Sequence, residues 1–259
     1  MLLVADLHIG FEYELARMGI NIPYQSHRLL NELLAMVTES KARRLVIVGD
    51  LKHGVPLASF QEKREIPQFF ETLREKVEMV EVVRGNHDGG LQNLVPDYVK
   101  VHSSKGILLG DAFKVGVFHG HAWPSPKVMA ADLLVVAHNH PTVVLRTPLG
   151  IRLSRRVWAK GACSGKSLAA AYLGKDRGQV EDDRIEKFRE AYDVSLGDPQ
   201  MILMPAFNDL LGGFPVNSDT PKSLLGPLMR TNAVDTSRFE VYLLDGTYLG
   251  KVDFLRTLS

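Results

Sequence analysis

Short apolar runs alternate with amphipathic segments through the first 140 residues of the chain. The runs are rich in Val, Ile and Leu and lie at 2–5, 45–48, 79–83, 107–109, 113–118 and 133–136. Uninterrupted runs of this kind are typical of strands that are covered on both faces. Because amphipathic segments separate them, the pattern predicts an α/β fold.

Three helices are expected between these runs. Residues 24–40 place one set of apolar residues on a single helical face: Leu29, Leu30, Leu33, Leu34 and Val37. Ser59 and Glu62 form a capping box. The helix that it opens carries Phe60, Ile66, Phe69, Phe70, Leu73 and Val77. Pro67 either kinks this helix or moves its start downstream, and Ser125 with Pro126 suits the first turn of a short third helix.

The second half of the chain predicts further strands and no chemistry of its own. Residues 143–145 and 151–157 favour a hairpin across 148–150, and 201–204 a buried strand. Residues 239–244 and 248–254 favour a last hairpin with a type I′ turn at Asp245-Gly246. Residues 164–198 are polar and predict short helices or a mobile excursion. We therefore expect one domain over 1–259, with all metal motifs in 1–141 and a second sheet completed by 142–259.

Polar side chains follow five of the apolar runs. The sets are Asp6 and His8; Asp50 and His53; Asn86, His87 and Asp88; His119 and His121; and His138 and His140. Seven of the nine histidines are among them. Since sites in open α/β sheets lie outside the carboxyl ends of strands, these groups are expected to converge. Gly49, Gly85 and Gly120 would let the backbone turn sharply beside a ligand.

Composition excludes several classes of protein. The net charge of +1 does not suit a highly basic nucleic-acid binder. Cys163 is the one cysteine, so an intramolecular disulfide is excluded and a reducing compartment is expected. No stretch approaches the roughly 20 apolar residues of a membrane helix, and the apolar start is too short for a signal peptide. The sequence therefore predicts a cytoplasmic protein with no membrane association.

The converging groups suit two metal ions. Imidazoles, carboxylates and one amide oxygen are ligands for Mn²⁺, Fe, Zn²⁺ or Ni²⁺. The seven candidate donors exceed what one tetrahedral ion takes: Asp6, His8, Asp50, Asn86, His119, His138 and His140. Two ions sharing a carboxylate acidify the water between them, which gives a hydroxide to attack phosphorus. His87 would then protonate the leaving oxygen, since imidazoles titrate near neutral pH.

The five blocks, in this order, resemble those of the calcineurin-like metallophosphoesterases. Asp6-Leu7-His8-Ile9-Gly10 and Gly49-Asp50-Leu51-Lys52-His53 look most like archaeal phosphoesterases related to SbcD-type repair nucleases and bacterial ligase-associated endonucleases. The resemblance implies a four-layer αββα sandwich of two mixed sheets. It also implies two ions, with Mn²⁺ preferred. Related chains often carry a strand before the first block, so here the edge strand is either missing or supplied by the C-terminal half.

The resemblance implies a role for each block. Asp6, His8 and His140 would hold one ion, Asn86, His119 and His138 the other, and Asp50 would bridge them. His87 would be the proton donor, with Asp88 orienting its imidazole. His53 would lie near the substrate. His119 is preferred over His121 as the ligand because it follows the strand more closely and because the family usually uses that position.

Two basic features have two interpretations each. Arg152, Arg155 and Arg156 could contact a nucleic-acid backbone or protect an edge strand against aggregation. Lys52 could clamp a phosphate or point to solvent. The stretch from Gly161 to Ser167 suggests a phosphate-binding loop but has one residue too few between its glycines, so we reject that function.

The sequence therefore predicts a two-metal phosphodiesterase or nuclease acting on DNA, RNA or a nucleotide phosphodiester. The alternatives are a small-molecule phosphomonoesterase and a non-catalytic scaffold with the same fold. An open groove beside the arginines would favour the diesterase, and a closed pocket around His87 the monoesterase. The sequence leaves a homodimer open, and a helicase or ATPase partner is suggested by the resemblance to repair nucleases alone.

Overall fold

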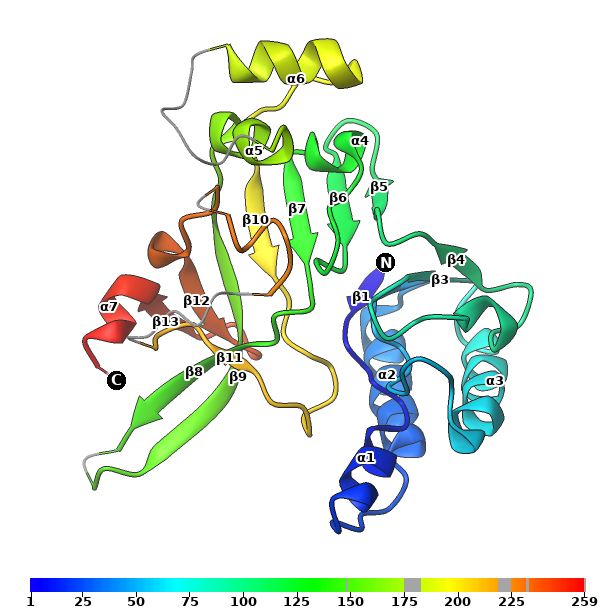
Figure 1. The fold of residues 1–259 in the computed structure, drawn as a ribbon. Helices are drawn as coiled ribbons and strands as arrows, with labels where there is room; N and C mark the ends of the chain where they lie inside the picture. The colour runs from blue at the N-terminus through cyan, green and yellow to red at the C-terminus, as the bar shows by residue number, and fades with distance from the viewer. Residues whose placement is uncertain (148, 175–182, 219–224, 232, 259) are drawn as a thin grey trace.

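Two β-sheets pack face to face in the computed structural model, which describes residues 1–147, 149–174, 183–218, 225–231 and 233–258 (Figure 1). The first sheet has four strands in the order β1-β2-β3-β4, and all are parallel. They are β1 (Leu2–Val4), β2 (Arg44–Val48), β3 (Met79–Val83) and β4 (Lys100–His102). The resemblance implied two mixed sheets, but every pairing in this first sheet is parallel.

The second sheet is mixed and has nine strands. They are β5 (Ile107–Leu109), β6 (Val115–Phe118), β7 (Leu133–Val136), β8 (Pro141–Arg146), β9 (Arg152–Ala162), β10 (Gln200–Leu203), β11 (Phe214–Pro215), β12 (Glu240–Leu243) and β13 (Tyr248–Lys251). Their order is β11-β8-β9-β10-β7-β6-β5, with β12 paired to β9 and β13 to β12. The outer parts of β8 and β9 project from the body as a long hairpin (Figure 1).

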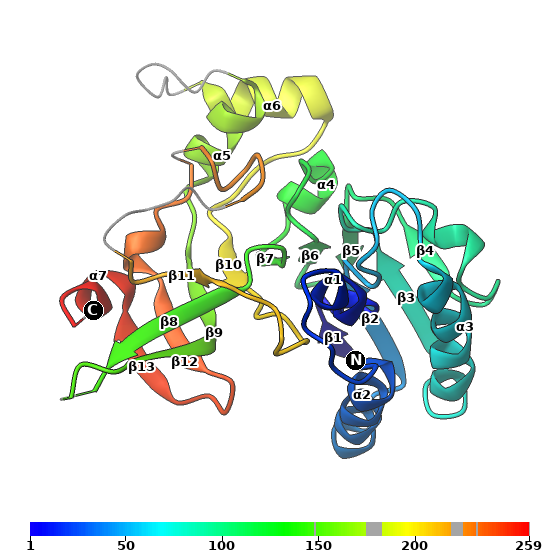
Figure 2. The ribbon, with the colours of Figure 1, turned by 60° about the horizontal axis from the view of Figure 1, so that its bottom comes forward.

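Helices cover the outer face of each sheet, which confirms the four-layer sandwich (Figure 2). α2 (Ser26–Ser40) and α3 (Phe60–Arg74) pack on the first sheet. α4 (Pro126–Met129), α5 (Gly165–Tyr172) and α6 (Arg184–Tyr192) share one apolar core with the second sheet. A third core of mainly Val and Ala side chains lies between the sheets.

The expected helices form, with one error in the assignment of faces. Leu29, Leu30, Leu33 and Val37 of α2 are buried. Ser59 caps α3, and the side chain of Glu62 completes the capping box. Pro67 lies inside α3 and does not move its start. The sequence pattern assigns Phe60 to the apolar face of α3. The residue is instead 84% exposed, because it occupies the first position of the helix.

The C-terminal hairpin differs from the prediction in two ways. A type I′ turn needs a positive φ at both central residues. Gly246 has a φ of 88°, but Asp245 is not among the described residues with positive φ, so the turn at Asp245-Gly246 is not type I′. The second strand ends at Lys251, and α7 (Val252–Arg256) follows where strand was expected through residue 254. Buried Val252 and Leu255 turn one side of this helix toward the core.

Residues 164–198 form short helices where they are described, and 175–182 lie outside the described residues. At the start of α5 the N–H of Gly165 donates to the carboxylate of Asp198 (2.7 Å). A protein carboxylate thus occupies the end of the helix where a phosphate would bind, which agrees with rejecting a phosphate loop. No helix of the described segments has the length and apolarity to cross a membrane.

The strand that precedes the first polar block is β1, at the edge of the first sheet. Among the described residues of the C-terminal half, no strand pairs with β1. Instead a loop passes its end, where the N–H of Phe207 donates to the carbonyl of Ala5 (2.7 Å). The remaining short helices are α1 (Phe11–Arg17), η1 (Leu91–Asn93) and η2 (Thr236–Arg238).

Candidate metal centre

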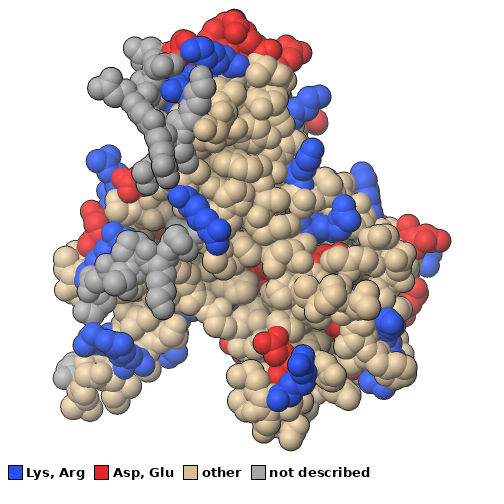
Figure 3. All heavy atoms as spheres, viewed as in Figure 1, with Lys and Arg blue, Asp and Glu red and all other residues tan. Residues whose placement is uncertain are grey.

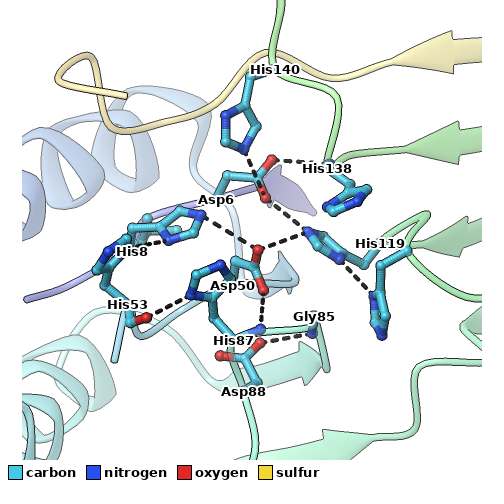
Figure 4. A network of polar contacts seen from close by, with 12 residues as sticks. Asp6, His8, Asp50, His53, Gly85, His87, Asp88, His119, His138 and His140 are labelled. Atoms are coloured by element: carbon cyan, nitrogen blue, oxygen red, sulfur yellow. Dashed lines mark hydrogen bonds and ion pairs between the residues drawn. The ribbon is translucent and has the colours of Figure 1, made fainter. Parts of the chain in front are cut away.

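The five polar strand ends meet where the carboxyl ends of both sheets come together (Figure 4). Asp6 and Asp50 follow β1 and β2, and His119 and His138 follow β6 and β7 of the other sheet. Both carboxylates are buried, and Nε2 of His119 lies 2.9 Å from Oδ1 of Asp6 and 3.4 Å from Oδ2 of Asp50. Residues far apart in the sequence therefore enclose one polar centre within a largely apolar interface.

Within this centre, ligand-capable atoms fall into groups whose members lie within 4.8 Å of one another. One group is Asp6, His8 and His140, the ligands expected for the first ion. Another is Asp50, His119 and His138, three of those expected around the second. The grouping matches the predicted division of ligands, with Asp50 3.4 Å from a histidine of each group, His8 and His119.

Backbone conformation also marks these residues. Five of the seven described non-glycine residues with positive φ are predicted ligands: Asp6 (55°), His8 (44°), Asp50 (47°), His138 (69°) and His140 (43°). Residues other than glycine adopt this conformation at a cost of about 1–3 kcal/mol each, and such strain clusters at functional sites. The strained backbone at these positions therefore lowers the stability of the fold and directs the five side chains toward one point.

Two positions require glycine, because the backbone there lies against side chains of predicted ligands. A Cβ at Gly85 would lie 2.1 Å from Oδ1 of Asp50. A Cβ at Gly49 would lie 2.2 Å from the ring of His119, and Gly49 also has a φ of 79°. Side chains at these positions would displace Asp50 and His119.

Two buried nitrogens point at the carboxylates without a hydrogen bond. Nε2 of His8 lies 3.4 Å from Asp50, and Nε2 of His140 lies 3.4 Å from Asp6. Nδ1 of His140 contacts the carbonyl of Gly212 at 3.1 Å, and because a carbonyl only accepts, that nitrogen carries the hydrogen. In the neutral ring Nε2 then presents a lone pair, which is the tautomer that binds metal. The donor set therefore fits divalent cations.

His119, rather than His121, lies among the carboxylates. Nδ1 of His121 contacts Nδ1 of His119 at 2.9 Å, on the side of the ring away from Asp6. His121 is only partly buried and is absent from the described groups of potential ligands. Its position suits a residue that orients His119.

The protonation of the centre follows from burial and from the two carboxylates. Burial lowers the pKa of His8 to about 2 and that of His138 to about 3, so both are neutral near pH 7. Burial raises the pKa of Asp50 to about 6, against the nearby His119. For His119 and His140 burial favours the neutral ring, but the contact with Asp6 outweighs it and raises the pKa of both. Protons thus occupy part of the site when metal is absent.

His87 lies outside the two groups that contain aspartates, in a third group with His8 and His53 that has no carboxylate, and one of its ring nitrogens has no protein partner in the described structure. Its Nδ1 contacts the carbonyl of His53 at 2.6 Å, so Nδ1 carries a hydrogen and Nε2 is free to gain or lose another. Its ring stacks on that of His53, with centroids 5.1 Å apart. Its backbone N–H donates to Oδ1 of Asp50 (2.8 Å), which places the ring beside this carboxylate.

Asp88 does not orient His87 as predicted. Its carboxylate accepts from the backbone N–H of Gly85 (2.8 Å) and of Lys52 (3.3 Å), and Figure 4 shows it turned toward Gly85. Burial raises its pKa. The orienting group for His87 is the carbonyl of His53, while Asp88 joins the turn at 85–88 to the end of β2.

The side chain of Lys52 neither reaches the predicted metal ligands nor points to solvent. Its side chain is fully buried, and Nζ donates to the carbonyl of Gly54. Its role is to hold the loop that carries His53, so its proposed phosphate contact was wrong. Asn86, in contrast, is exposed and has no polar contact from its side chain within the described structure, so its amide remains available as a ligand.

The second half of the chain does contribute to the site, contrary to the prediction. Nδ2 of buried Asn208 donates to the carbonyl of Leu7 (3.0 Å), between the ligands Asp6 and His8. Gly212 accepts from His140, and the N–H of Phe214 donates to the carbonyl of His140 (3.0 Å). No sequence pattern pointed to this loop, because its contacts are made mainly by backbone atoms and become visible only in the fold.

The three arginines separate into two kinds. Nη1 of Arg156 donates to the carbonyls of Ala206 and Phe207 (2.8 and 2.6 Å), which anchors the same loop. Arg152 and Arg155 are exposed on the projecting hairpin, where Figure 3 shows a cluster of basic side chains. Residues 152–156 pair only with β8, so this part of β9 is an open edge and both interpretations of Arg152 and Arg155 remain compatible with it.

The chain is similar to a known protein family and to known structures. The model of the calcineurin-like phosphoesterases matches residues 1–168. The chain is similar to the nuclease MPE of Pseudomonas putida, with 19% identity, 93% of this chain and 81% of that chain covered, and a TM-score of 0.47. It is also similar to Yfce, a phosphoesterase from E. coli, with 22% identity, 58% and 74% covered, and a TM-score of 0.37. No curated protein sequence matches.

Proposed function

The chain belongs to the calcineurin-like phosphoesterase family, and from that premise we propose that it is a two-metal phosphodiesterase acting on nucleic acid or on nucleotide phosphodiesters. The observation that carries the proposal is the pair of donor groups that contain the aspartates, with His87 beside them in a third group, of His8, His53 and His87, that has no carboxylate. A centre built in this way can bind a phosphate and protonate the oxygen that leaves it.

Asp6, His8 and His140 would hold one ion, and His119, His138 and Asn86 the other, with Asp50 shared between them. Divalent ions bound there supply Lewis acidity, which neutralises phosphate charge and lowers the pKa of water. The donors suit Mn²⁺, Fe, Zn²⁺ or Ni²⁺, and Mn²⁺ is the preferred ion in this proposal because the resemblance of the five blocks to the metallophosphoesterases implies it.

His87 is the proposed general acid. Its Nδ1–H is held by the carbonyl of His53, so the exchangeable proton sits on Nε2. Because that nitrogen has no protein partner in the described structure, it can face the leaving oxygen. Removal of a general acid lowers the rate by about 10²–10⁴-fold.

The space beside His87 supports an ester with a bulky leaving group. A cavity of about 960 Å³ adjoins His87 and His53, at the upper end of the range for small-molecule sites. A small alcohol as leaving group would leave much of it filled with water. The nucleoside of a nucleic-acid or nucleotide ester has enough bulk to occupy it.

One assay tests the proposal. Metal-free protein is reconstituted with Mn²⁺ and offered bis(p-nitrophenyl) phosphate, p-nitrophenyl phosphate and single-stranded DNA. We expect the diester and the DNA to be hydrolysed faster than the monoester. His87→Ala should lose most turnover while retaining two ions per chain, and His27→Ala, which changes an exposed histidine outside the centre, should match the wild type.

Three results would contradict parts of the proposal. Absence of turnover with Mn²⁺, Fe²⁺, Zn²⁺ and Ni²⁺ would favour a scaffold without catalysis. Faster hydrolysis of the monoester would favour a phosphomonoesterase. Equal rates for wild type and His87→Ala would remove His87 from the acid role.

A further inference from the structure

The cavity beside His87 has a built apolar side that the phosphate chemistry does not require. It is bounded by α1, by the segment that follows it up to Tyr24, and by residues 53–62. His87 and His53 lie at its border. A group that occupied it would therefore be attached to the phosphate oxygen nearest the proposed acid.

Three exposed aromatic residues line this cavity. The exposed fractions are 55% for Tyr13, 58% for Tyr24 and 84% for Phe60, and exposed Leu57 lies among them. Aromatic surface left in water within a concave site is a mark of ligand binding rather than of folding. Their π-faces offer stacking surfaces for flat rings.

The charged residues of the cavity are mostly engaged in internal contacts. Both carboxylate oxygens of Glu62 accept backbone N–H groups, and Glu14 contacts Nε2 of His53. Oε1 of Glu12 accepts from Gln61 (2.6 Å). Because these carboxylates still make the lining more negative than Arg17 can balance, a second phosphate would be repelled there.

The rings present separate faces. No ring contact joins any two of Tyr13, Tyr24 and Phe60 among the described aromatic pairs, and Cζ of Arg64 already lies over the ring of Tyr24, 5.9 Å from its centroid. Separate ring faces suit a flat, uncharged group with polar edges. A nucleoside, which has an aromatic base and no charge, matches both properties.

We propose that this cavity binds the nucleoside that leaves during hydrolysis, with its base stacked on Tyr13 or Phe60; this rests on the proposed function. The reaction consumes one water. Its oxygen forms the new bond to phosphorus, and the bond between phosphorus and the nucleoside oxygen breaks. That oxygen takes the proton of His87, and the proton released by the water restores the protonated ring.

Binding without catalysis is the first test. Adenosine, which has no phosphate, is titrated into metal-free protein and followed by NMR. We expect saturable binding that Tyr13→Ala or Phe60→Ala weakens about 5- to 100-fold, the range for loss of one base-stacking ring, and that Tyr13→Phe retains. Phe113→Ala is the control, because Phe113 is 60% exposed outside the cavity; equal melting temperatures verify folding.

Kinetics form the second test. A dinucleoside monophosphate is compared with the methyl ester of the same nucleotide, whose leaving methanol cannot stack. Tyr13→Ala should raise KM about 5- to 100-fold for the first substrate, with kcat nearly retained, and leave the second unchanged. Equal effects on both substrates would overturn the proposal.

The two proposals can fail separately. If wild type hydrolyses diesters but adenosine does not bind and Tyr13→Ala is without effect, the cavity is not a nucleoside site and the phosphodiesterase remains. If no diester is hydrolysed with any metal but adenosine binds and Tyr13→Ala weakens it, the nucleoside site stands and the catalytic proposal is lost.

Discussion

Nδ1 of His8 lies 2.9 Å from Nδ1 of His53, so one nitrogen donates and the other accepts. The far nitrogen of His53 contacts the carboxylate of Glu14, which can only accept, and therefore carries a hydrogen. A neutral His53 then accepts at Nδ1, and His8 donates. Nε2 of His8 is left with a lone pair facing Asp50, as a metal ligand requires.

This series of hydrogen bonds makes Glu14 and His53 positioning residues for His8. We expect Glu14→Ala to weaken one of two Mn²⁺ sites by about tenfold, because outer groups that fix a histidine ligand contribute about 10–100-fold to metal affinity. Calorimetric titration of metal-free protein measures both sites. Glu39→Ala changes an exposed glutamate on α2 and should leave both affinities unchanged. Unaltered binding in Glu14→Ala would show that Glu14 does not set the tautomer.

Two glycines of one turn give a sharper test of the centre. Gly85→Ala would place a Cβ 2.1 Å from Oδ1 of Asp50, whereas Gly89→Ala would meet its nearest atom, the carbonyl of Pro56, at 3.7 Å. We expect Gly85→Ala to fold but to bind fewer than two ions per chain, since the bridging carboxylate must move. Gly89→Ala should bind two. Metal analysis after reconstitution measures both, and two ions in Gly85→Ala would mean that Asp50 is not a bridging ligand.

The sequence predicted the centre better than it predicted the surroundings. Asp6, Asp50 and His138 could be assigned because each follows an apolar strand, and strand ends converge by a general rule of α/β sheets. The parallel arrangement of the first sheet and the contacts of Asp88 could not be assigned. Pairing direction depends on how the chain crosses between strands, and Asp88 is bonded to a backbone N–H 36 positions away.

The loop that carries Asn208 shows a second limit of sequence patterns. Its hydrogen bonds to the first polar block join residues about 200 positions apart. Apolar periodicity reports burial against neighbours in space and does not identify them. For Arg156 the charge suggested a ligand outside the protein, whereas its partners are two carbonyls of this loop.

Asn208→Ala tests whether the loop positions the first block. The variant loses the hydrogen bond to the carbonyl of Leu7 and the one that Oδ1 accepts from the N–H of Leu210 (3.1 Å). Leaving the buried carbonyl unpaired should lower the free energy of unfolding by about 1–3 kcal/mol in metal-free protein. If the loop also positions Asp6 and His8, the variant should gain less stability from Mn²⁺ than the wild type does. Urea unfolding with EDTA and with Mn²⁺ measures both quantities. Asn93→Ala, at an exposed position, is the control; equal gains in Asn208→Ala and wild type would reduce the loop to a structural role.

Metal affinity should fall as the pH decreases. The pKa of Asp50 is raised to about 6 by burial, so below that pH the metal-free site holds a proton that an ion must displace. His119 and His140, whose pKa values are raised by Asp6, also release protons on binding, so the decrease begins above pH 6.5. Each displaced proton lowers the affinity about tenfold per pH unit below its pKa. His8 and His138 are already neutral and contribute nothing above pH 5. Calorimetry between pH 5.5 and 8, in two buffers of different ionisation enthalpy, gives both the affinity and the number of protons released. Release of at least one proton per chain at pH 6.5 is expected; an affinity independent of pH would place Asp50 outside the metal ligands.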